Sequence, residues 1–297
     1  MMSAVERWCW RNGLRPTGIS IVRRMGHVQV EREGGVVTVT LSNPGKKNAL
    51  PGSAWPELEA ACRAIAGRRD DRCVVLTGAG DDFCSGADVS QPTPTPEPEP
   101  QVAPDGGVAP DGEVGGLRFM RTVSAAVEAL HAVPQPVVAR VAGVCVGVGM
   151  NLALACDIVI AGDDARFSEI FARRALSIDG GGSWLLPRIV GLQKAKELAL
   201  LAEIVPADRA ERLGLVTRVV PRADLDATVA DVAGRLAAGP PRAMQATKRL
   251  LNEGVHASLA DALEAEAQAQ TANFGTRDTA EAMAAFGERR QPTFEGR

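Results

Sequence analysis

Residues 136–157 of the chain read PVVARVAGVCVGVGMNLALACD. The apolar run Pro136–Val141 has the length of a strand, and the glycine-rich turn Gly143–Met150 follows it directly. The pattern of Gly149–Ala155 favours the start of a helix, and the apolar run Asp157–Ala161 predicts another strand. The stretch therefore predicts a strand, a glycine turn, a helix and a strand, which is the alternation typical of an α/β fold.

The same alternation continues on both sides of this stretch. Upstream, two runs with apolar residues at alternating positions are separated by a turn that contains Gly34 and Gly35, which predicts a strand hairpin. Strands are expected at His27–Arg32, Val36–Leu41 and Cys73–Thr77, and helices at Pro51–Ala66, Gln193–Ala202 and Ala207–Leu213. Strands that alternate with helices indicate an α/β domain.

The pattern changes after Val219, where the strand signal stops. Helices are expected at Asp224–Ala238, Arg242–Glu253, Leu259–Asn273 and Ala280–Glu288. We therefore divide the chain into an extension at 1–24, an α/β core at 25–220 and a helical C-terminal subdomain at 221–297. The extension has no strand or helix pattern, so we expect it to be poorly ordered or to precede the start codon that is used.

A proline-rich insertion interrupts the core at residues 91–116. Seven prolines occur between Gln91 and Pro110, and the units Ala103–Gly106 and Ala109–Gly112 resemble one another. Such a composition cannot fill a core and favours polyproline II backbone, so we expect a mobile surface loop. A lid is the alternative, because a glycine turn directly precedes the insertion.

Composition excludes several kinds of function. The 297 residues carry a formal net charge of −3, which disfavours general binding of nucleic acid or of anionic membranes. No apolar run approaches the length of a membrane span, and we expect a cytoplasmic protein. The 6 cysteines lack any C-x-x-C pair and are expected to be reduced core residues. The 3 histidines are too scattered for a metal site or a His-based nucleophile relay.

A second glycine turn, Phe83–Asp88, follows the strand Cys73–Thr77. Each turn is expected to leave main-chain N–H groups unpaired, and the turn Gly143–Met150 leads into a helix whose dipole favours negative charge. Two such amides aimed at one point form an oxyanion hole, which stabilises the enolate of a thioester. Either turn is alternatively a tight bend that only permits close packing. A dinucleotide-binding motif is disfavoured, because Gly147-Val148-Gly149 lacks the third glycine.

From Met25 to Arg297 the chain resembles the enoyl-CoA hydratase/isomerase, or crotonase, family. The motifs that carry the resemblance are, in the family's order, Asn43–Leu50, Phe83–Asp88, Val141–Gly149 with Cys156-Asp157, Ala207–Val220, and Ala282–Arg290 with Phe294. The resemblance implies a crotonase-like α/β fold, a spiral of ββα repeats, with a helical C-terminal subdomain for assembly as a homotrimer or homohexamer. It also implies an acyl-CoA substrate, with no metal and no cofactor besides the coenzyme A thioester itself.

The resemblance further implies which residues form the site. The oxyanion amides are expected to be those of Ala87 and Val148. Coenzyme A is expected to lie along Lys47–Leu50 and Ala87–Val89, with Phe286 and Arg289 reaching the ligand of a neighbouring subunit. The complete set of expected substrate-binding residues is Lys47, Asn48, Ala49, Leu50, Ser85, Asp88, Val89, Gly147, Asn151, Phe171, Trp184, Phe286 and Arg289.

The carboxylates indicate which reaction of the family to expect. Family hydratases use two glutamates around a water molecule, and the matching positions here are Asn151 and Phe171. Neither side chain moves a proton, so the standard hydratase route is disfavoured. Asp179 lies at a glycine-rich turn, where family isomerases keep their acid. We therefore expect Asp179 to act as acid and base in a 1,3-proton shift.

Alternatives remain for these carboxylates. Asp179 is also a typical N-cap for a helix near Ser183–Arg188. Glu169 is expected to be a buried partner of Arg173 or Arg174. If the chain is a hydratase, however, Glu169 or Asp179 would have to supply the missing base. A non-catalytic acyl-CoA binder, a thioester hydrolase and a dehalogenase are the remaining alternatives.

Three further positions have structural interpretations beside functional ones. Asp157 is expected to tie down a strand end. Trp184 either lines the acyl pocket or belongs to the core. Lys248 and Arg249 either contact a phosphate across a subunit boundary or are simply solvated.

Overall fold

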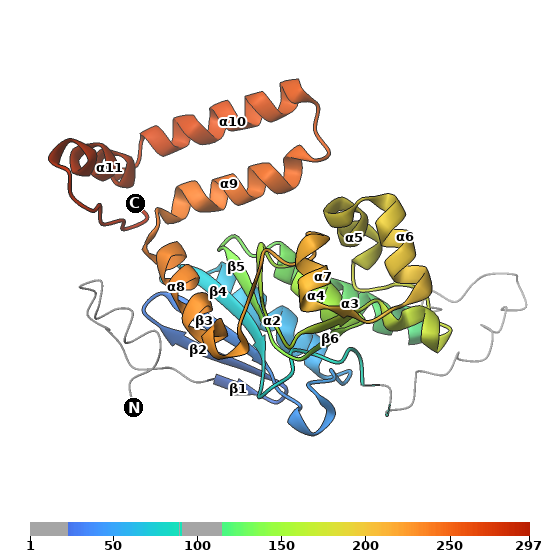
Figure 1. Cartoon of the computed structure of the whole chain (residues 1–297). Helices are drawn as coiled ribbons and strands as arrows, with labels where there is room; N and C mark the ends of the chain where they lie inside the picture. The colour runs from blue at the N-terminus through green and yellow to red at the C-terminus, as the bar shows by residue number, and fades with distance from the viewer. Residues whose placement is uncertain (1–22, 89, 91–114) are drawn as a thin grey trace, which may run out of the picture.

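The computed structural model describes residues 23–88, 90 and 115–297. The predicted extension at 1–24 and the insertion at 91–116 therefore lie almost wholly outside the described residues, and Val89 lies outside them as well. The described chain is an α/β fold in which helices cover both faces of one large sheet (Figure 1). The α/β class expected from the sequence is confirmed.

The large sheet joins an antiparallel hairpin to a series of parallel strands. Its order is β1-β2-β3-β4-β5-β7-β10. The strands are β1 Arg23–Met25, β2 Val28–Glu33, β3 Val36–Leu41, β4 Cys73–Gly78, β5 Val137–Val141, β7 Ile158–Gly162 and β10 Arg218–Val220. Neighbours from β1 to β3 pair antiparallel, and all later neighbours pair parallel. Parallel pairing brings the carboxyl ends of β4 and β5 to the same edge, where both glycine turns begin.

A second sheet contains β6 Val144–Val146, β8 Arg166–Ser168 and β9 Val205–Pro206 in that order. This sheet is not predicted by the sequence patterns. Its strands are only two or three residues long, which is too short for a periodic pattern to show. The small sheet matters for the site, because β6 lies within the glycine turn Gly143–Met150.

Helices and single turns connect the strands. They are η1 Pro44–Lys46, α2 Ala54–Ala66, α3 Gly115–His131, α4 Val148–Leu154, η2 Ile170–Arg174, α5 Gly182–Val190, α6 Leu192–Leu201, α7 Ala207–Arg212, η3 Arg222–Asp224, α8 Leu225–Ala238, α9 Pro241–Gly254, α10 Leu259–Phe274 and α11 Arg277–Glu288. The main core joins one face of the large sheet to α2, α3 and α4, and includes the fully buried side chains of Trp55, Phe83 and Phe167. Burial of this apolar surface is the main stabilising contribution to the fold.

Most predicted elements are confirmed to within a few residues. The helix expected from Pro51 begins later, at Ala54, because Leu50 is held extended by pairing with Ala87. No helix was predicted for the segment that forms α3, although Val123, Val127 and Leu130 recur at helical spacing and are buried.

Helix α8 differs from its predicted place in the C-terminal subdomain. Leu225, Val229 and Ala233 of α8 pack on Val75 and Val138 of the large sheet, where they form a second buried cluster. The helices that project from the core are therefore α9, α10 and α11 (Figure 1). The subdomain that the sequence analysis began at residue 221 thus contains one helix that belongs to the core.

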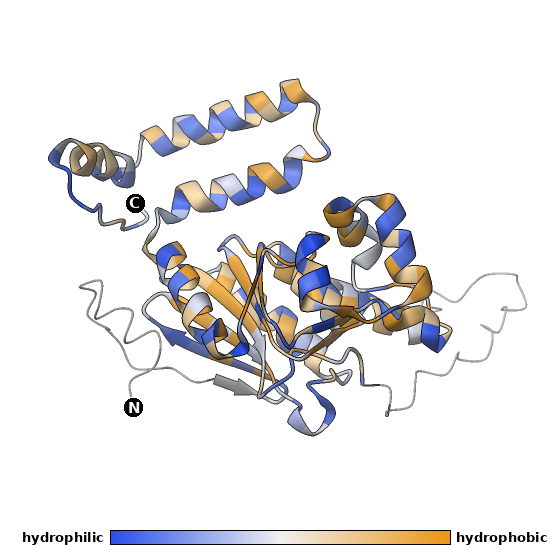
Figure 2. Cartoon of the chain, in the orientation of Figure 1, coloured by the Kyte–Doolittle hydropathy of each residue, from blue (hydrophilic) through white to orange (hydrophobic). Residues whose placement is uncertain are grey.

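The projecting helices expose large apolar side chains. The most exposed are Leu251, Val255, Leu259, Phe274, Met283 and Phe286. Figure 2 shows hydrophobic bands between hydrophilic ones along α9 and α10, in contrast to the continuously hydrophobic central strands. Apolar surface of this kind marks interaction sites, and the homotrimer or homohexamer remains a prediction.

The expectations about buried cysteines and about membrane-spanning segments can be compared with the described residues. Cys62, Cys73, Cys84, Cys145 and Cys156 are free and buried, as predicted, and burial raises the pKa of the Cys84 thiol to about 12. None of the helices in the described ranges combines the length and apolar content needed to cross a bilayer.

Candidate active site

The two glycine turns lie against each other. The Cys84 N–H donates to the Val144 carbonyl at 2.9 Å, and the Val146 N–H donates to the Cys84 carbonyl at 3.0 Å. A Cβ atom at Gly149 would lie 2.6 Å from the Cys84 carbonyl oxygen, so this approach requires glycine. The close packing that was the structural alternative for these turns is thus present, and it joins the two loops into one site.

In each turn, the amide expected to face the thioester oxygen has no acceptor among the described residues. The Leu50 N–H donates to the Gly86 carbonyl at 2.8 Å and the Asp88 N–H donates to the Leu50 carbonyl at 2.9 Å, so the intervening Ala87 amide faces away from Leu50. Val148 is the first residue of α4, after Gly147 with a φ of 57°. Within the described part of the chain, neither the Ala87 N–H nor the Val148 N–H has a hydrogen-bond acceptor. Both amides are available to a ligand oxygen.

The turn that carries Asp179 packs on the start of α4. Asn151 Nδ2 donates to the Asp179 main-chain carbonyl at 2.8 Å. A Cβ atom at Gly180, which has a φ of 56°, would lie 2.6 Å from Val148 Cγ2. These contacts hold the Asp179 turn against the Val148 side chain at the start of α4, although the two residues are distant in sequence.

The Asp179 carboxyl is half-buried and forms no salt bridge with any described residue. Its Oδ1 atom is inaccessible to solvent and has no hydrogen-bond partner. The N-cap of α5 is Gly181, without any side-chain cap, so the N-cap alternative for Asp179 is wrong. Burial raises the pKa of Asp179 to about 6, which leaves a carboxylate at neutral pH that accepts a proton more readily than an exposed one.

Glu169 is the residue whose role the sequence analysis assigned incorrectly. Its side chain is 1% exposed, and in the described structure it forms no ion pair with Arg173 or Arg174, which are both exposed. Instead, Asn151 Nδ2 donates to Glu169 Oε2 at 3.4 Å, while Glu169 Oε1 has no partner. Burial, together with the nearby Asp179 charge, raises the pKa of Glu169 to about 8. The structure thus adds a second carboxyl to the site.

The two positions at which family hydratases carry glutamate also meet here. Asn151 is fully buried on α4, and Phe171 is buried on η2. Phe171 Cζ would lie 3.8 Å from a Cβ atom at Gly147, so the ring covers the turn that precedes α4. The Gly147 N–H donates to the Ser168 carbonyl at 2.8 Å and holds that turn in place. Apolar and amide groups therefore occupy the places of the two hydratase acids.

The residues expected along coenzyme A form one ridge beside Ala87. Lys47 is exposed, while Ala49 and Leu50 are buried and the Ser85 N–H donates to the Lys47 carbonyl at 2.9 Å. Asp88 forms an ion pair with Lys46 at 2.7 Å, and hydrogen bonds from Lys46 and Ser90 lower the pKa of Asp88 to about 2.

Asn48 supports this ridge from inside. Its side chain is fully buried, accepts from the Asn43 N–H at 3.0 Å, and donates to the carbonyls of Ala79 and Asp82 at 2.9 Å and 2.7 Å. Because the Asn48 side chain is used within the protein, it shapes the ligand surface without lining it.

Three expected residues lie farther from the turns. Trp184 on α5 stacks with the Arg188 guanidinium at 4.1 Å and lines a cavity of about 750 Å³ that also includes Gly181. Phe286, 85% exposed, and Arg289 belong to the end of α11, which projects away from the turns of its own chain (Figure 1). This position leaves open the expected contact with a neighbouring subunit.

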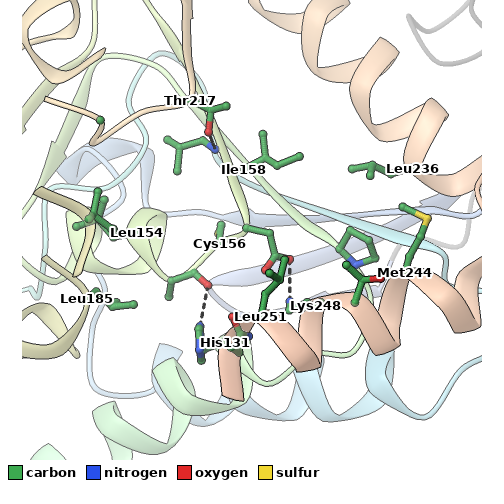
Figure 3. A pocket seen from close by; sticks show the side chains of 18 of the residues that line it. His131, Leu154, Cys156, Ile158, Leu185, Thr217, Leu236, Met244, Lys248 and Leu251 are labelled. Carbon is green, nitrogen blue, oxygen red and sulfur yellow. Dashed lines mark hydrogen bonds and ion pairs between the residues drawn. The ribbon is translucent and has the colours of Figure 1, made fainter. Parts of the chain in front are cut away.

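A different cavity, of about 670 Å³, lies at the opposite end of α4 (Figure 3). It is lined by Leu154, Cys156, Leu185 and Leu251, and one wall carries Asp157 and Lys248. These two side chains form an ion pair at 2.8 Å and Lys248 is only 10% exposed, so the alternative that Lys248 is simply solvated is wrong. The cavity has no unpaired carboxyl and is separate from the Asp179 site.

Among the described residues, no group of three or more His, Cys, Asp or Glu side chains could hold a metal ion.

Comparison with known proteins identifies relatives along nearly the whole chain. The enoyl-CoA hydratase/isomerase family matches residues 31–104 and 116–297. The chain is 36% identical over 270 residues to a probable enoyl-CoA hydratase of Rhodobacter capsulatus, with 91% of this chain and 98% of that protein covered. It is 34% identical over 267 residues to a 1,2-epoxyphenylacetyl-CoA isomerase of Escherichia coli, with 89% and 97% covered.

A solved structure supports the same relationship. A putative enoyl-CoA hydratase from Streptomyces coelicolor aligns with a TM-score of 0.81 at 37% identity, with 95% of this chain and 98% of that chain covered. The fold is thus the crotonase fold expected from the sequence. Because motifs, fold and relatives agree over nearly the full length, this chain belongs to the enoyl-CoA hydratase/isomerase family and is an enzyme that acts on acyl-CoA.

Proposed function

We propose that the enzyme moves the double bond of an unsaturated acyl-CoA by a 1,3-proton shift, with Asp179 as acid and base. The observation that carries the proposal is the half-buried, unpaired Asp179 carboxyl on a turn that packs against Val148. The amides of Ala87 and Val148 would receive the thioester oxygen. A single carboxylate beside one oxyanion hole is sufficient for this reaction.

In the proposed reaction, Asp179 removes a proton from C2 of a 3-enoyl thioester. The electron pair of the C2–H bond delocalises toward the thioester oxygen and C4, which forms a dienolate. Protonated Asp179 then returns the proton to C4, and the product is the conjugated 2-enoyl thioester. The proton and electrons balance without any further reactant. A pKa of about 6 suits a group that must be ionised at neutral pH and still accept a proton.

Coenzyme A would follow the ridge of Lys47–Leu50 and Ala87 in this proposal. Support comes from the pairing of Leu50 with Ala87, which joins the ridge directly to one oxyanion amide. In an assembly of the expected kind, Phe286 and Arg289 would contact the ligand of a neighbouring subunit.

Hydration of an enoyl-CoA is the second candidate. It is favoured by one observation, the buried Glu169 carboxyl that shares Asn151 with Asp179. A base of pKa about 6 and an acid of pKa about 8 would provide the two groups that water addition needs. The absence of acids at positions 151 and 171 argues against the standard arrangement of these groups.

The test is a panel of acyl-CoA substrates assayed for migration and for hydration. Trans-3-hexenoyl-CoA reports migration through the absorbance of the conjugated product, and crotonyl-CoA reports water addition. Asp179→Asn should lower kcat for migration by about 10²–10⁴-fold, the usual contribution of a general acid/base. Asp70→Asn, at an exposed carboxylate remote from the site, should leave kcat unchanged.

Unchanged migration in folded Asp179→Asn would contradict the proposed role of Asp179. Faster hydration than migration in the wild type would favour the second candidate. Acyl-CoA binding without turnover of any panel member would indicate a non-catalytic binder.

A further inference from the structure

We infer that Glu169 is an uncharged positioning residue of this site, which orients Asn151 and through it the Asp179 turn, and whose ionisation stops the reaction. The inference rests on the proposed role of Asp179. It assigns a function to a residue that lies outside the two positions at which hydratases of the family carry glutamate.

The first support is the shared amide group. Both N–H bonds of Asn151 Nδ2 are used, one toward the Asp179 carbonyl at 2.8 Å and one toward Glu169 Oε2 at 3.4 Å. A Cβ atom at Gly182 would lie 2.5 Å from Asn151 Nδ2, so the turn is packed directly on this amide. A change at Glu169 is therefore transmitted to the turn that holds Asp179.

The second support is the lack of any partner suited to a charged Glu169. The side chain is 1% exposed, and Glu169 Oε1 and Asn151 Oδ1 are buried without hydrogen-bond partners. A buried carboxylate normally has a cation or several donors around it. Among the described residues, the one hydrogen bond to this carboxyl comes from the Asn151 amide at 3.4 Å, and a bond of this length suits a protonated carboxyl better than a charged one.

Burial and the Asp179 charge both favour the uncharged form of the Glu169 carboxyl, because both raise its pKa. The nearby Cys145 thiol on β6 is kept neutral mainly by its own burial, which raises its pKa. A thiol is either neutral or anionic, so it cannot stabilise a negative charge on Glu169. Arg166 on β8 and Arg173 and Arg174 on η2, the cations nearest in sequence, are exposed and form no ion pair with Glu169 in the described structure.

Ionisation of Glu169 would place a second negative charge beside Asp179 and the forming dienolate. The extra charge would oppose the enolate in the oxyanion hole and make proton removal from C2 less favourable. Activity would therefore rise as Asp179 ionises near pH 6 and fall as Glu169 ionises near pH 8.

The test is the pH profile of migration of trans-3-hexenoyl-CoA by the full chain. For the wild type we expect kcat to fall about tenfold per pH unit above the upper pKa. Glu169→Gln keeps the side-chain shape and a carbonyl oxygen that accepts from Asn151, but it cannot ionise. Its kcat should therefore stay level above the upper pKa of the wild type, with KM little changed. Glu31→Gln, at an exposed glutamate on β2, should keep the wild-type profile.

A wild type without an alkaline decrease, or a Glu169→Gln variant that retains it, would overturn the inference. Loss of all activity in folded Glu169→Gln would also overturn it, because that result makes Glu169 a catalytic acid. Asp179→Asn in the same assay separates the two proposals. If it stays active, the proposed function fails. If it is inactive while Glu169→Gln keeps the alkaline decrease, only the inference about Glu169 fails.

Discussion

Two aspartates flank helix α4, and their surroundings are opposite. Asp157, beyond the C-terminal end of α4, accepts from the Val137 N–H at 2.7 Å and pairs with Lys248 at 2.8 Å. Asp179, beside the N-terminal end, has a buried Oδ1 without a partner and a pKa raised by burial. The Asp157 carboxylate is fully used by a hydrogen bond and an ion pair within the protein, whereas the Asp179 carboxylate is left available for a substrate proton.

The two aspartates show how a carboxylate with a structural role differs from a candidate catalytic carboxylate in this fold. A paired carboxylate joins elements, as Asp157 joins the start of β5 to α9. An unpaired buried carboxylate costs stability and is retained where it has another use. Mutations at the Asp157 end should therefore change mainly the free energy of unfolding, whereas mutations at the Asp179 end should also change kcat.

The largest expected effect is that of Gly149→Ala, which disturbs only the Asp179 end of α4. The new Cβ would clash with main-chain and side-chain atoms of Cys84, at 2.6 Å and 2.8 Å, which separates the two turns. We expect the free energy of unfolding to fall by about 3 kcal/mol. Migration activity should be lost as well, because the oxyanion amides move apart.

Gly287→Ala is the matched control for that change. Gly287 lies within α11, and no atom lies within 4 Å of the Cβ that the change would add. Alanine should stabilise this helix by about 0.5–1 kcal/mol. Urea unfolding checks both variants, and an equally stable Gly149→Ala enzyme would contradict the close packing of the turns.

The next effect is a dependence of stability on pH that arises from Glu169, near the Asp179 end of α4. The folded chain keeps Glu169 protonated up to about pH 8, whereas the unfolded chain releases that proton at a lower pH. The unfolded state thus binds fewer protons, and the free energy of unfolding falls as pH rises, until the folded carboxyl also ionises.

Between about pH 6 and pH 8 this loss should approach, at most, about 1.4 kcal/mol per pH unit. Glu169→Gln should remove it, because glutamine does not titrate. Urea unfolding of both proteins at several pH values measures the difference. If the free energy of unfolding depended on pH in the same way for both proteins, that result would contradict a raised pKa at Glu169.

The smallest effect is expected at the structural end. Asp157→Asn keeps an acceptor for the Val137 N–H but loses the charge that pairs with Lys248. Because the Asp157 side chain is 25% exposed, the free energy of unfolding should fall by only about 1–2 kcal/mol. Kcat for migration should stay within about twofold of the wild type, since Asp157 lies outside the proposed chemistry. A large loss of kcat in folded Asp157→Asn would remove the distinction between the two ends.

Much of the fold and part of the site followed from local sequence patterns. Strands β3, β4 and β5 and the helices α6 and α9 occur close to the predicted ranges, because apolar periodicity is a property of neighbouring residues. The glycines of both turns and the placing of Asp179 near Val148 were likewise accessible from motifs, although the roles of these residues remain proposals.

Local patterns and motifs were enough to identify the α/β class, the family and the candidate acid Asp179. The packing of α8 on the sheet, the ion pair of Asp157 with Lys248, and the contact of Glu169 with Asn151 instead of an arginine became visible only in the folded chain. The reason is physical. Strand and helix patterns depend on residues a few positions apart, whereas the partner of a buried charge is set by long-range packing. Glu169 lies 18 residues from Asn151, and the Asp179 carbonyl lies 28 residues from it.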